Sequence, residues 1–309
     1  MSRTRVALLT AVVVAGAVVA APAAQAAPPL VGWATQGGGT TGGGGATPVT
    51  VSTAAAFTAA VSAGAPAVIR VSGTITLSSM AKIASNKTII GSGANATITG
   101  QGLNISRAAN VIVRNLNFRS WGDDAIQVEY SNRIWIDHNS FSSGKDGAVD
   151  VKRASDLVTV SWNKFSSHNK TMLLGHSDGN GGEDRGKLRV TYHHNHFDGT
   201  QQRHPRVRFG NPVHVFNNYY GGVTDYGVAA TVEAGVLVEG NFFENTKDPY
   251  HLGEGSSPGG SLVARDNHFV NSGSGQTGGS VKSIPYSYTL DRASDVRSIV
   301  RNGAGAGRI

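Results

Sequence analysis

The chain has 309 residues, of which 41 are Gly and none is Cys, and its formal net charge is +7 at pH 7. This length suffices to bury a sizeable core in one domain, and the absence of cysteine excludes disulfide cross-links as a source of stability. The basic balance suits an anionic partner, but no Lys/Arg run, basic amphipathic helix or nucleic-acid motif accompanies it. We therefore expect neither nucleic-acid nor membrane binding.

Residues 1–26 predict a secretory signal peptide. Arg3 and Arg5 precede an apolar run that ends at Ala24-Gln25-Ala26, which is the order of charged, apolar and small residues in such peptides. Cleavage after Ala26 would lower the formal charge from +7 to +5 and leave residues 27–309, which we interpret as a single domain. No later segment is long and apolar enough to cross a bilayer. We expect a secreted, extracellular monomer.

The next residues predict a lead-in and a short helix. Residues 35–47 (ATQGGGTTGGGGA) are rich in Gly and Thr, which indicates a loop or an extended stretch. Ser52 or Thr53 is a suitable N-cap for a helix over residues 54–64 (AAAFTAAVSAG). A helix of this kind can cover the open end of a stacked domain.

Further along, a short β-branched run ending in Asn and, two residues later, an aromatic recurs six times. The endings are Asn139–Phe141, Asn163–Phe165, Asn195–Phe197, Asn218–Tyr220, Asn241–Phe243 and Asn267–Phe269. A degenerate run that ends at Phe118 lacks the Asn, and the steps between closing aromatics are 23, 24, 32, 23, 23 and 26 residues. A unit that repeats at this period is typical of a solenoid.

Each repeat contains one strand of seven or eight residues followed by turn-forming residues, and no helical period lies between the strands. The pattern predicts an all-β fold, a single-stranded right-handed parallel β-helix with short capping helices. Residues 67–77 and 87–100 would form the earliest coils. Stacked strands would lie about 4.8 Å apart, with equivalent Asn side chains in a hydrogen-bonded ladder and the aromatics stacked inside. A β-sandwich with similar strands is the alternative.

Two further segments complete the predicted solenoid. Residues 293–302 (ASDVRSIVRN) have the apolar spacing of a short helix, which we expect to pack along the last coils. The 32-residue step contains extra residues near 179–186, which predict a loop beside the charged edge described next.

Charged residues follow the closing aromatics at a nearly constant distance. Asp124 and Arg203 lie six residues after their aromatics, and Asp146 and Lys170 lie five residues after theirs. Because stacked coils keep their phase, these side chains should share one edge at about 5 Å from coil to coil. The edge would be acidic on two coils and basic on the next two. Other charged residues fall near the same phase: Asp123, Asp150 and Arg208.

This edge combines two kinds of ligand chemistry. Crowded carboxylates repel one another unless a cation lies between them, and Ca²⁺ accepts several oxygen ligands in irregular geometry. The basic half suits an anionic ligand, since Arg binds carboxylates through two parallel hydrogen bonds. A metal site beside a cationic rim predicts recognition of a uronic-acid polysaccharide.

Several motifs carry a family resemblance over nearly all of residues 27–309. They are GWATQGGGTTGG (32–43), WIDHNSF (135–141), DGAVDVKRASDLVTVSWNKF (146–165), HNKTMLLGHSD (168–178) and RHPRVRFG (203–210). Together they resemble pectate lyases of the first polysaccharide lyase family. The resemblance implies a parallel β-helix, Ca²⁺ as cofactor, and cleavage of de-esterified polygalacturonate (pectate) by β-elimination to give unsaturated oligogalacturonides.

The resemblance also implies roles for single residues. Three aspartates match the positions of calcium ligands in that family: Asp124, Asp146 and Asp150. Lys170 matches a lysine that binds the substrate carboxylate, Arg203 the proposed catalytic base, and Arg208 an arginine that binds substrate. The chain departs from the family at Gly122, where an aspartate ligand is common, and Asp123 is the candidate replacement. Water is the expected acid for the leaving oxygen.

Three other functions remain open at this point. A pectin lyase would act on methylated pectin without calcium, but such relatives typically have a basic residue at the position of Asp150. A galacturonan hydrolase needs two carboxylates flanking the bond, whereas the motifs at Gly122 and Gly175 lie two coils apart. A non-catalytic β-helix that binds acidic polysaccharide would not need Lys170, Arg203 and Arg208 together.

Overall fold

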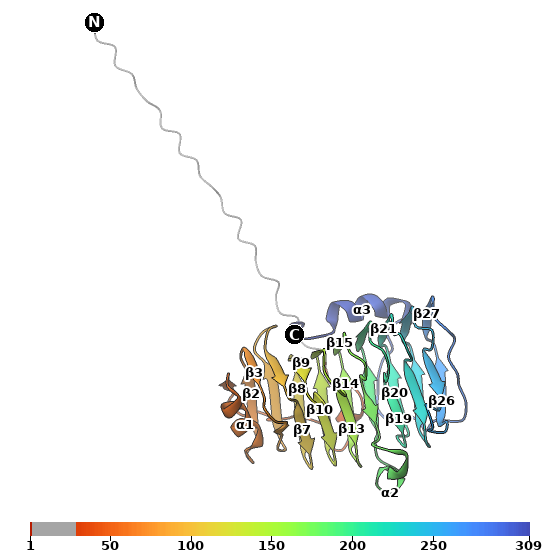
Figure 1. Cartoon of the computed structure of the whole chain (residues 1–309), viewed down its shortest axis with the longest axis horizontal. Coiled ribbons are helices and arrows are strands. Elements are labelled where there is room, and N and C mark those ends of the chain that lie inside the picture. Colours follow the sequence, from red (N-terminus) through yellow and green to blue (C-terminus); the bar gives the residue numbers. More distant parts are fainter. Residues whose placement is uncertain (2–28) are drawn as a thin grey trace.

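The computed structural model describes Met1 and residues 29–309; apart from Met1, the predicted signal peptide lies outside the described residues. Figure 1 shows successive coils side by side along one axis, from the coil beside α1 (Ala54–Ser62) to the one that ends in β27 (His268–Val270). Neighbouring strands within each sheet are parallel. The predicted parallel β-helix is confirmed.

Each complete coil contributes one strand to each of three sheets, whereas the first and last turns of the solenoid contribute to fewer. Sheet A contains β1 (Val49–Val51), β2 (Ala67–Val71), β5 (Lys87–Gly91), β8 (Ala109–Arg114), β11 (Asn132–Asp137), β14 (Asp156–Ser161), β17 (Val190–His193), β20 (Val213–Phe216), β23 (Gly235–Glu239) and β26 (Ser261–Arg265). Sheet B contains β3 (Thr74–Thr76), β6 (Thr97–Gly100), β9 (Asn117–Trp121), β12 (Ser140–Ser142), β15 (Lys164–Ser166), β18 (His196–Asp198), β21 (Tyr219–Gly221), β24 (Phe242–Glu244) and β27. Sheet C contains β4 (Ala81–Lys82), β7 (Leu103–Ser106), β10 (Ile126–Glu129), β13 (Val149–Lys152), β16 (Leu173–Leu174), β19 (Arg206–Arg208), β22 (Val228–Thr231) and β25 (Tyr250–Leu252).

The expectation of one long strand per repeat was wrong, because each run is divided in two at the Asn. The run at 134–141, for example, is split between β11 in sheet A and β12 in sheet B. His138 precedes the corner Asn with φ of 51°, and Trp162 and His194 have φ of 54° at equivalent positions. A residue in the left-handed region turns the chain sharply. The alternation of β-branched residues does not reveal such a corner.

The predicted Asn ladder is confirmed, and all of its members except Asn267 in the last coil are buried. Each side-chain amide nitrogen donates to the amide oxygen of the next coil over five consecutive steps: Asn139–Asn163 (3.0 Å), Asn163–Asn195 (3.1 Å), Asn195–Asn218 (3.0 Å), Asn218–Asn241 (3.0 Å) and Asn241–Asn267 (3.0 Å). Each oxygen also accepts a backbone N–H, as between Asn139 N and Asn163 Oδ1 (2.9 Å). Because every amide is paired, the buried corner has little desolvation cost.

The aromatic side chains two residues after the ladder form the predicted internal stack. Their ring centroids lie 4.4–5.4 Å apart along the series Phe118, Phe141, Phe165, Phe197, Tyr220, Phe243 and Phe269. All but Phe269, in the last coil, are buried. Offset rings at this spacing attract one another in addition to the area that they bury. The stack therefore ties the coils together along the solenoid axis.

The predicted capping helix over 54–64 is confirmed as α1. The Thr53 hydroxyl oxygen accepts the N–H of Ala56 (3.3 Å) and so serves as the N-cap, while Phe57 and Val61 are fully buried. The helix covers the first coils, where the core would otherwise meet water. No helix of residues 29–309 has both the length and the apolar character needed to cross a bilayer.

The predicted C-terminal helix is also confirmed. Residues 293–295 form η3 (Ala293–Asp295), and α3 (Val296–Gly303) continues it. Val296 and Val300 bury their side chains against Tyr219 and Phe242 of sheet B. Figure 1 shows α3 lying along the outside of the coils that contain β15 and β21.

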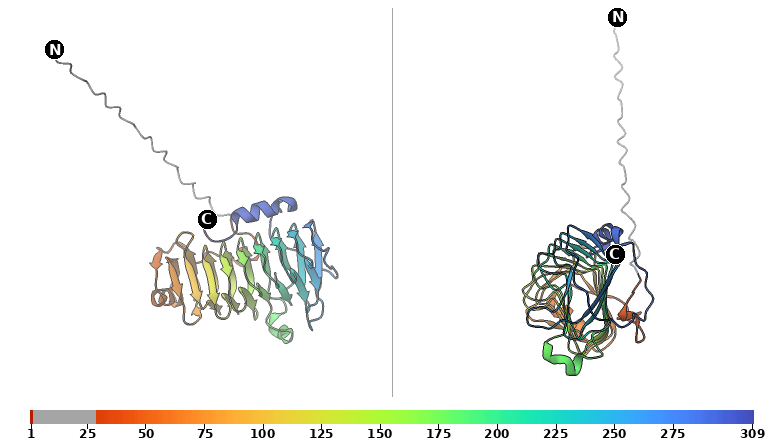
Figure 2. Two further views of the ribbon diagram at one scale, coloured as in Figure 1. Left: turned by 45° about the horizontal axis from the view of Figure 1, so that its top comes forward. Right: turned by 90° about the vertical axis from the view of Figure 1, so that its right-hand side faces the viewer.

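The loop predicted near 179–186 contains two short helical turns. They are η2 (Asp178–Asn180) and α2 (Gly181–Asp184), which follow β16. Viewed along the solenoid, this segment projects from one side of the stack (Figure 2). The lead-in at the other end of the chain includes η1 (Trp33–Thr35), whose Trp33 N–H donates to Thr191 Oγ1 (2.9 Å) on sheet A.

Candidate active site

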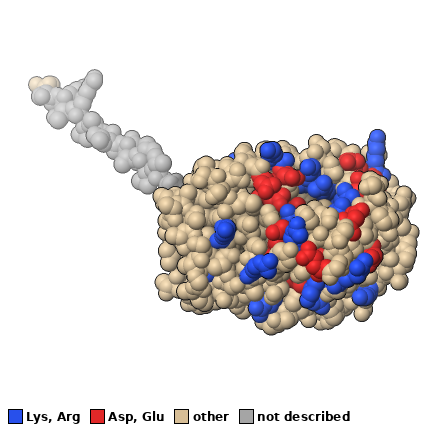
Figure 3. Space-filling model, turned by 60° about the horizontal axis from the view of Figure 1, so that its bottom comes forward, with Lys and Arg blue, Asp and Glu red and all other residues tan. Residues whose placement is uncertain are grey.

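The charged residues predicted to share an edge lie between sheet B and sheet C on four consecutive coils. Three backbone hydrogen bonds join these coils at the edge: Asp146 N–H to Asp123 O (3.2 Å), Ala148 N–H to Lys170 O (3.3 Å) and Thr171 N–H to Gln202 O (3.1 Å). Lys170 and Gln202 also form a parallel β-bridge. The coil register therefore stacks the predicted positions above one another. Figure 3 shows side chains of both charges gathered on this face, over the middle and C-terminal coils.

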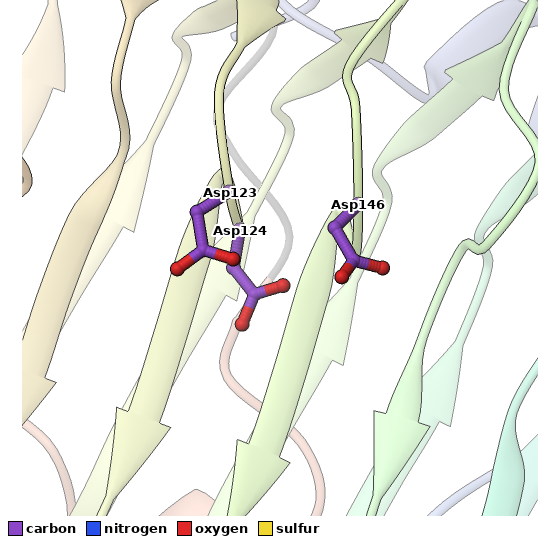
Figure 4. Close-up of side chains that lie close together, drawn as sticks. All are labelled: Asp123, Asp124 and Asp146. Carbon is purple, nitrogen blue, oxygen red and sulfur yellow. The ribbon is translucent and has the colours of Figure 1, made fainter.

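The acidic half of the edge is a compact group of three aspartates. Asp123 and Asp124 come from the segment between β9 and β10, and Asp146 comes from the same position on the next coil. Carboxylate oxygens of the three lie within 4.8 Å of one another, and Figure 4 shows Asp124 directed between the other two. Asp123 is exposed, whereas Asp124 is 3% exposed. The sequence alone left the contribution of Asp123 open, and it belongs to this group.

Asp150 lies beside this group on β13 and is more enclosed. Its Oδ1 accepts the backbone N–H of Leu173 (3.1 Å). A β-carbon at Gly147 would lie 2.3 Å from Asp150 Oδ1 and 2.7 Å from Asp124 Oδ1, so the glycine leaves room for both carboxylates to converge. Burial and the charge of Asp124 raise the pKa of Asp150 from 3.8 to about 8. Burial likewise raises the pKa of Asp124.

Lys152 is a residue of this site that sequence reasoning missed. Its Nζ lies 2.8 Å from Asp124 Oδ2 and 3.9 Å from Asp150 Oδ2. Burial disfavours the ammonium, but Asp150 and Asp124 outweigh that cost and raise the pKa of Lys152. The only available signal was its position two residues after Asp150, which places both side chains on the same face of a strand.

The basic half begins at Lys170, directly beside the acidic group. Lys170 Nζ donates to Asp146 Oδ1 (3.1 Å), and both side chains are well exposed, at 39% and 45%. An exposed pair of this kind is weak in water. Lys170 can therefore exchange Asp146 for a carboxylate of a ligand at little cost.

Arg203 follows on the next coil and is held by its backbone. Its carbonyl accepts the N–H of Met172 (2.7 Å), and its φ is 65°. The next residue, His204, is buried; its Nδ1–H donates to Tyr226 O (2.8 Å) and its Nε2 accepts from Thr200 Oγ1 (2.8 Å). Arg203 Nε is enclosed and has no hydrogen-bond partner among the described residues. This donor is therefore available to a ligand or to water.

Arg208 ends β19 and is paired with a residue of the projecting loop. Its Nε donates to Asp178 Oδ1 (2.6 Å), and its Nη1 lies 3.4 Å from Gly175 O. The hydrogen bond from Arg208 lowers the pKa of Asp178. Asp178 was not among the residues that the sequence singled out, because nothing in its local motif indicates what it contacts.

The acidic residues fit a calcium ion. The donors are carboxylate oxygens, the ligand type that Ca²⁺ prefers, and they come from two adjacent coils in irregular geometry. Lys152 contacts two of the four carboxylates and Lys170 contacts a third, so negative charge remains in excess. Burial, and after it the charge of Asp124, raises the pKa of Asp150. A divalent cation would neutralise this excess.

Comparisons with known proteins identify the family of this chain. A family model described as pectate lyase matches residues 6–309. A probable pectate lyase A of Aspergillus flavus is 42% identical over 266 residues, which cover 82% of this chain and 81% of the relative. A pectate trisaccharide-lyase of Bacillus licheniformis is 40% identical over 283 residues, covering 84% of this chain and 81% of the relative.

Solved structures give the same result. The crystal structure of a pectate lyase from Bacillus sp. N165 in complex with trigalacturonate has a TM-score of 0.82 and 34% identity, and the match covers 90% of this chain and 99% of that one. The chain belongs to the pectate lyase family. It is accordingly an enzyme, a polysaccharide lyase of the pectate lyase type.

Proposed function

We propose that this enzyme cleaves de-esterified polygalacturonate by calcium-assisted β-elimination at the charged edge, releasing unsaturated oligogalacturonides. The observation that carries the proposal is the order of charges along the edge: an oxygen-rich group on two coils, followed by Lys170, Arg203 and Arg208 on the next two. An acidic sugar polymer laid across the coils would meet the cation site and the basic residues in succession.

Calcium would be held by Asp124, Asp146 and Asp150, with Asp123 in place of the aspartate that Gly122 lacks. When bound, the ion would neutralise the carboxylate of the sugar and stabilise the negative charge that develops as C5 loses its proton. Lys152 would remain hydrogen-bonded to Asp124, where it limits the repulsion between carboxylates. Asp150 would then be ionised, because a cation opposes the rise in its pKa.

Lys170 and Arg208 would bind the substrate carboxylates. Lys170 now pairs with Asp146, and Arg208 pairs with Asp178 through Nε alone. Once Asp146 serves as a cation ligand, Lys170 is released to bind a sugar. Arg208 keeps Nη2 for a second carboxylate, since this nitrogen donates to no residue within 29–309.

Arg203 would act as the base. The C5 proton is weakly acidic because C5 is α to a carboxylate, and it would pass to a guanidine nitrogen of Arg203 as the bond between C4 and the leaving oxygen breaks. Water would protonate the leaving oxygen. A guanidinium gives up its proton only under strongly basic conditions, so the proposal includes an alkaline activity optimum.

The test compares two substrates with and without calcium. The purified protein is incubated with polygalacturonate and with highly methylated pectin, in calcium and in chelator, while the ultraviolet absorbance of the unsaturated product is followed. Absorbance with polygalacturonate in calcium, abolished by chelator, is the expected result. Reducing ends without absorbance would mean hydrolysis, and chelator-resistant activity on methylated pectin would mean a pectin lyase.

The place and form of the enzyme are proposals of the same kind. Residues 27–309 would be the exported catalytic domain, acting outside the cell as a monomer on a polymer that cannot enter it. Mass spectrometry of the protein recovered from culture medium would locate the cleavage, which we expect after Ala26.

A further inference from the structure

Two loops that are far apart in the sequence meet beside the basic half of the charged edge. Asp178 lies in η2, after β16, and Ser257 lies in the turn that follows β25. The Ser257 hydroxyl donates to Asp178 Oδ1 (2.9 Å), although 79 residues separate the two. Coils with β19 and β22 lie between them in the sheet order. This contact therefore bridges two coils, including the one that carries Arg208.

The same carboxylate oxygen holds Arg208. Asp178 Oδ1 accepts from Arg208 Nε at 2.6 Å as well as from Ser257, and Gly175 O lies 3.4 Å from Arg208 Nη1. Arg208 is 9% exposed. A guanidinium contacted at both Nε and Nη1 has a defined plane, and Nη2 is the nitrogen left for a ligand.

Ser257 extends the arrangement to a second arginine. Arg206 Nη2 donates to Ser257 Oγ (2.9 Å) and to Glu254 O (3.0 Å). Arg206 and Arg208 are two residues apart on β19, so both side chains stand on the same face of the sheet. Two neighbouring guanidinium groups repel each other, and the carboxylate of Asp178, which contacts Arg208 directly and Arg206 through Ser257, offsets part of that repulsion.

We propose that Asp178 is a positioning residue for the reaction: with Ser257 it fixes the plane of Arg208 so that Nη2 faces the substrate carboxylate. The proposal rests on the proposed function, because it takes Arg208 to be a substrate-binding residue. Ser257 is the second member of this bridge, and its contact with Arg206 joins the turn after β25 to β19.

The local sequence is consistent with a requirement for this geometry. Gly175 has φ of 91°, and a β-carbon there would lie 2.7 Å from Arg208 Cβ. The glycine thus lets the chain pass close to Arg208 before it turns into the loop that carries Asp178. The close approach brings both Gly175 O and Asp178 to the same guanidinium.

A different role for Asp178 gives the opposite expectation. If this carboxylate merely competed with the sugar for Arg208, or merely added negative charge near the charged edge, its neutralisation would tighten substrate binding. If it positions Arg208, its neutralisation weakens binding, since a charge-assisted hydrogen bond of good geometry is lost. The sign of the change in KM decides between these roles.

The experiment is a double-mutant cycle on polygalacturonate in calcium, with Asp178→Asn, Arg208→Lys and the combination. We expect Asp178→Asn to raise KM about tenfold while kcat changes by less than about threefold, because binding geometry rather than the base is disturbed. In the Arg208→Lys protein the same change should alter KM by less than about twofold, since lysine has no plane to fix. Ser257→Ala should raise KM by a smaller factor, about threefold.

Glu183→Gln is the matched control, because Glu183 lies on the same loop in α2 and contacts Arg153 rather than Arg208. It should leave KM and kcat unchanged. A KM for Asp178→Asn at or below the wild-type value overturns the proposal, as does a tenfold effect that persists beside Arg208→Lys. If Asp178→Asn fails to fold, by circular dichroism, Ser257→Ala decides: an unchanged KM overturns the proposal.

These outcomes are separable from failure of the proposed function. If the wild-type protein gives no unsaturated product from polygalacturonate, the function is wrong whatever Asp178 does. If Arg208→Lys has the wild-type KM, Arg208 does not bind substrate. This result overturns both the role proposed for Arg208 and the positioning role proposed for Asp178. Activity in the wild type, a raised KM in Arg208→Lys and an unaltered KM in Asp178→Asn remove only the positioning role.

Discussion

The Asn ladder and the charged edge are both rows of polar side chains that recur from coil to coil, yet their polar groups are satisfied differently. Asn163 is fully buried, and its amide oxygen and nitrogen each have two partners. Asp150 is almost as buried, but its pKa is raised to about 8, and Arg203 Nε has no partner among the residues that the structure describes. The ladder satisfies its own polar groups, whereas the edge retains a carboxyl whose ionisation burial disfavours and a donor without a partner among residues 29–309.

This difference separates stability from function within one repeating fold. A change in the ladder should destabilise the solenoid, because partners in two neighbouring coils lose their hydrogen bonds. A change on the edge should alter binding or turnover and leave the fold in place. Mutations in the two regions test whether that separation holds.

The largest effect is expected for Arg203→Lys. Loss of the base should lower kcat about 10²–10⁴-fold, while the melting temperature stays within roughly 2 °C of the wild type. Product absorbance and thermal unfolding monitor the two quantities. Arg185→Lys, at an exposed arginine that pairs with Glu233, should retain full activity. Wild-type turnover in Arg203→Lys would refute the assigned role.

The ladder should show the reverse pattern in Asn163→Ala. The change leaves donors of Asn139 and the amide oxygen of Asn195 with fewer partners in a buried corner, which should cost roughly 2–4 kcal/mol in the free energy of unfolding. Denaturant unfolding measures it. Asn95→Ala, at an exposed asparagine outside the ladder, should cost less than about 0.5 kcal/mol. Equal losses in both variants would contradict the distinction.

A smaller effect is expected when the acidic group is altered. Asp124→Asn should weaken calcium binding at least about tenfold, because ligand charge sets the affinity of such sites. Titration calorimetry of the purified variants measures this, with Asp198→Asn, an exposed partner of Lys164, as the control. Asp123→Asn should weaken binding less than Asp124→Asn, and an unchanged affinity would mean that Asp123 does not replace the ligand missing at Gly122.

The stability of the fold should decrease with rising pH because of Asp150 at the charged edge. In chelator, Asp150 has a pKa of about 8 in the folded chain against an ordinary value of 3.8. The folded state therefore binds a proton that the unfolded state lacks, and this contribution is lost as pH rises towards 8, by up to about 1.4 kcal/mol per pH unit. Between pH 6.5 and 8 the melting temperature should fall. The slope of melting temperature against pH should be smaller in Asp150→Asn. An identical slope in the wild type and the variant would refute the assignment of this effect to Asp150.

The acid limb should come from buried histidines outside the acidic group. Burial lowers the pKa of His204 from 6.5 to about 3. Below pH 6.5 this histidine therefore binds a proton in the unfolded chain but not in the folded chain. Stability should fall with pH in that range, by up to about 1.4 kcal/mol per unit for this residue. Measured in the Asp150→Asn protein, His204→Gln should reduce the slope. A slope that is the same with either residue would contradict this account.

The fold could be read from the spacing of residues because every coil repeats the same local requirement. The Asn and the aromatic two residues later recur in phase, and stacking coils in register places them in a ladder and a stack. The phase of Asp146 and Lys170 likewise predicted that they would share an edge, and the two side chains are in contact. The division of each run at residues such as His138 was not predictable from alternation, since it depends on a left-handed corner.

The spacing of residues in the sequence could not predict which side chains of different coils are in contact. Nothing near Lys152 in the chain shows that its ammonium contacts Asp124, because that pairing depends on the register between β10 and β13. Nothing near Asp178 shows that it meets both Arg208 and Ser257, because that contact depends on the paths of two irregular loops.

The repeat therefore predicted the architecture and the position of the candidate site, and the motifs indicated the family. These properties depend on local sequence and on a constant coil length. The three-dimensional structure decided which charges pair, which are buried and which nitrogen of Arg208 has no hydrogen-bond partner among residues 29–309. Those properties arise from side chains of different coils meeting in a region of low dielectric, where distance and burial outweigh the order of residues along the chain.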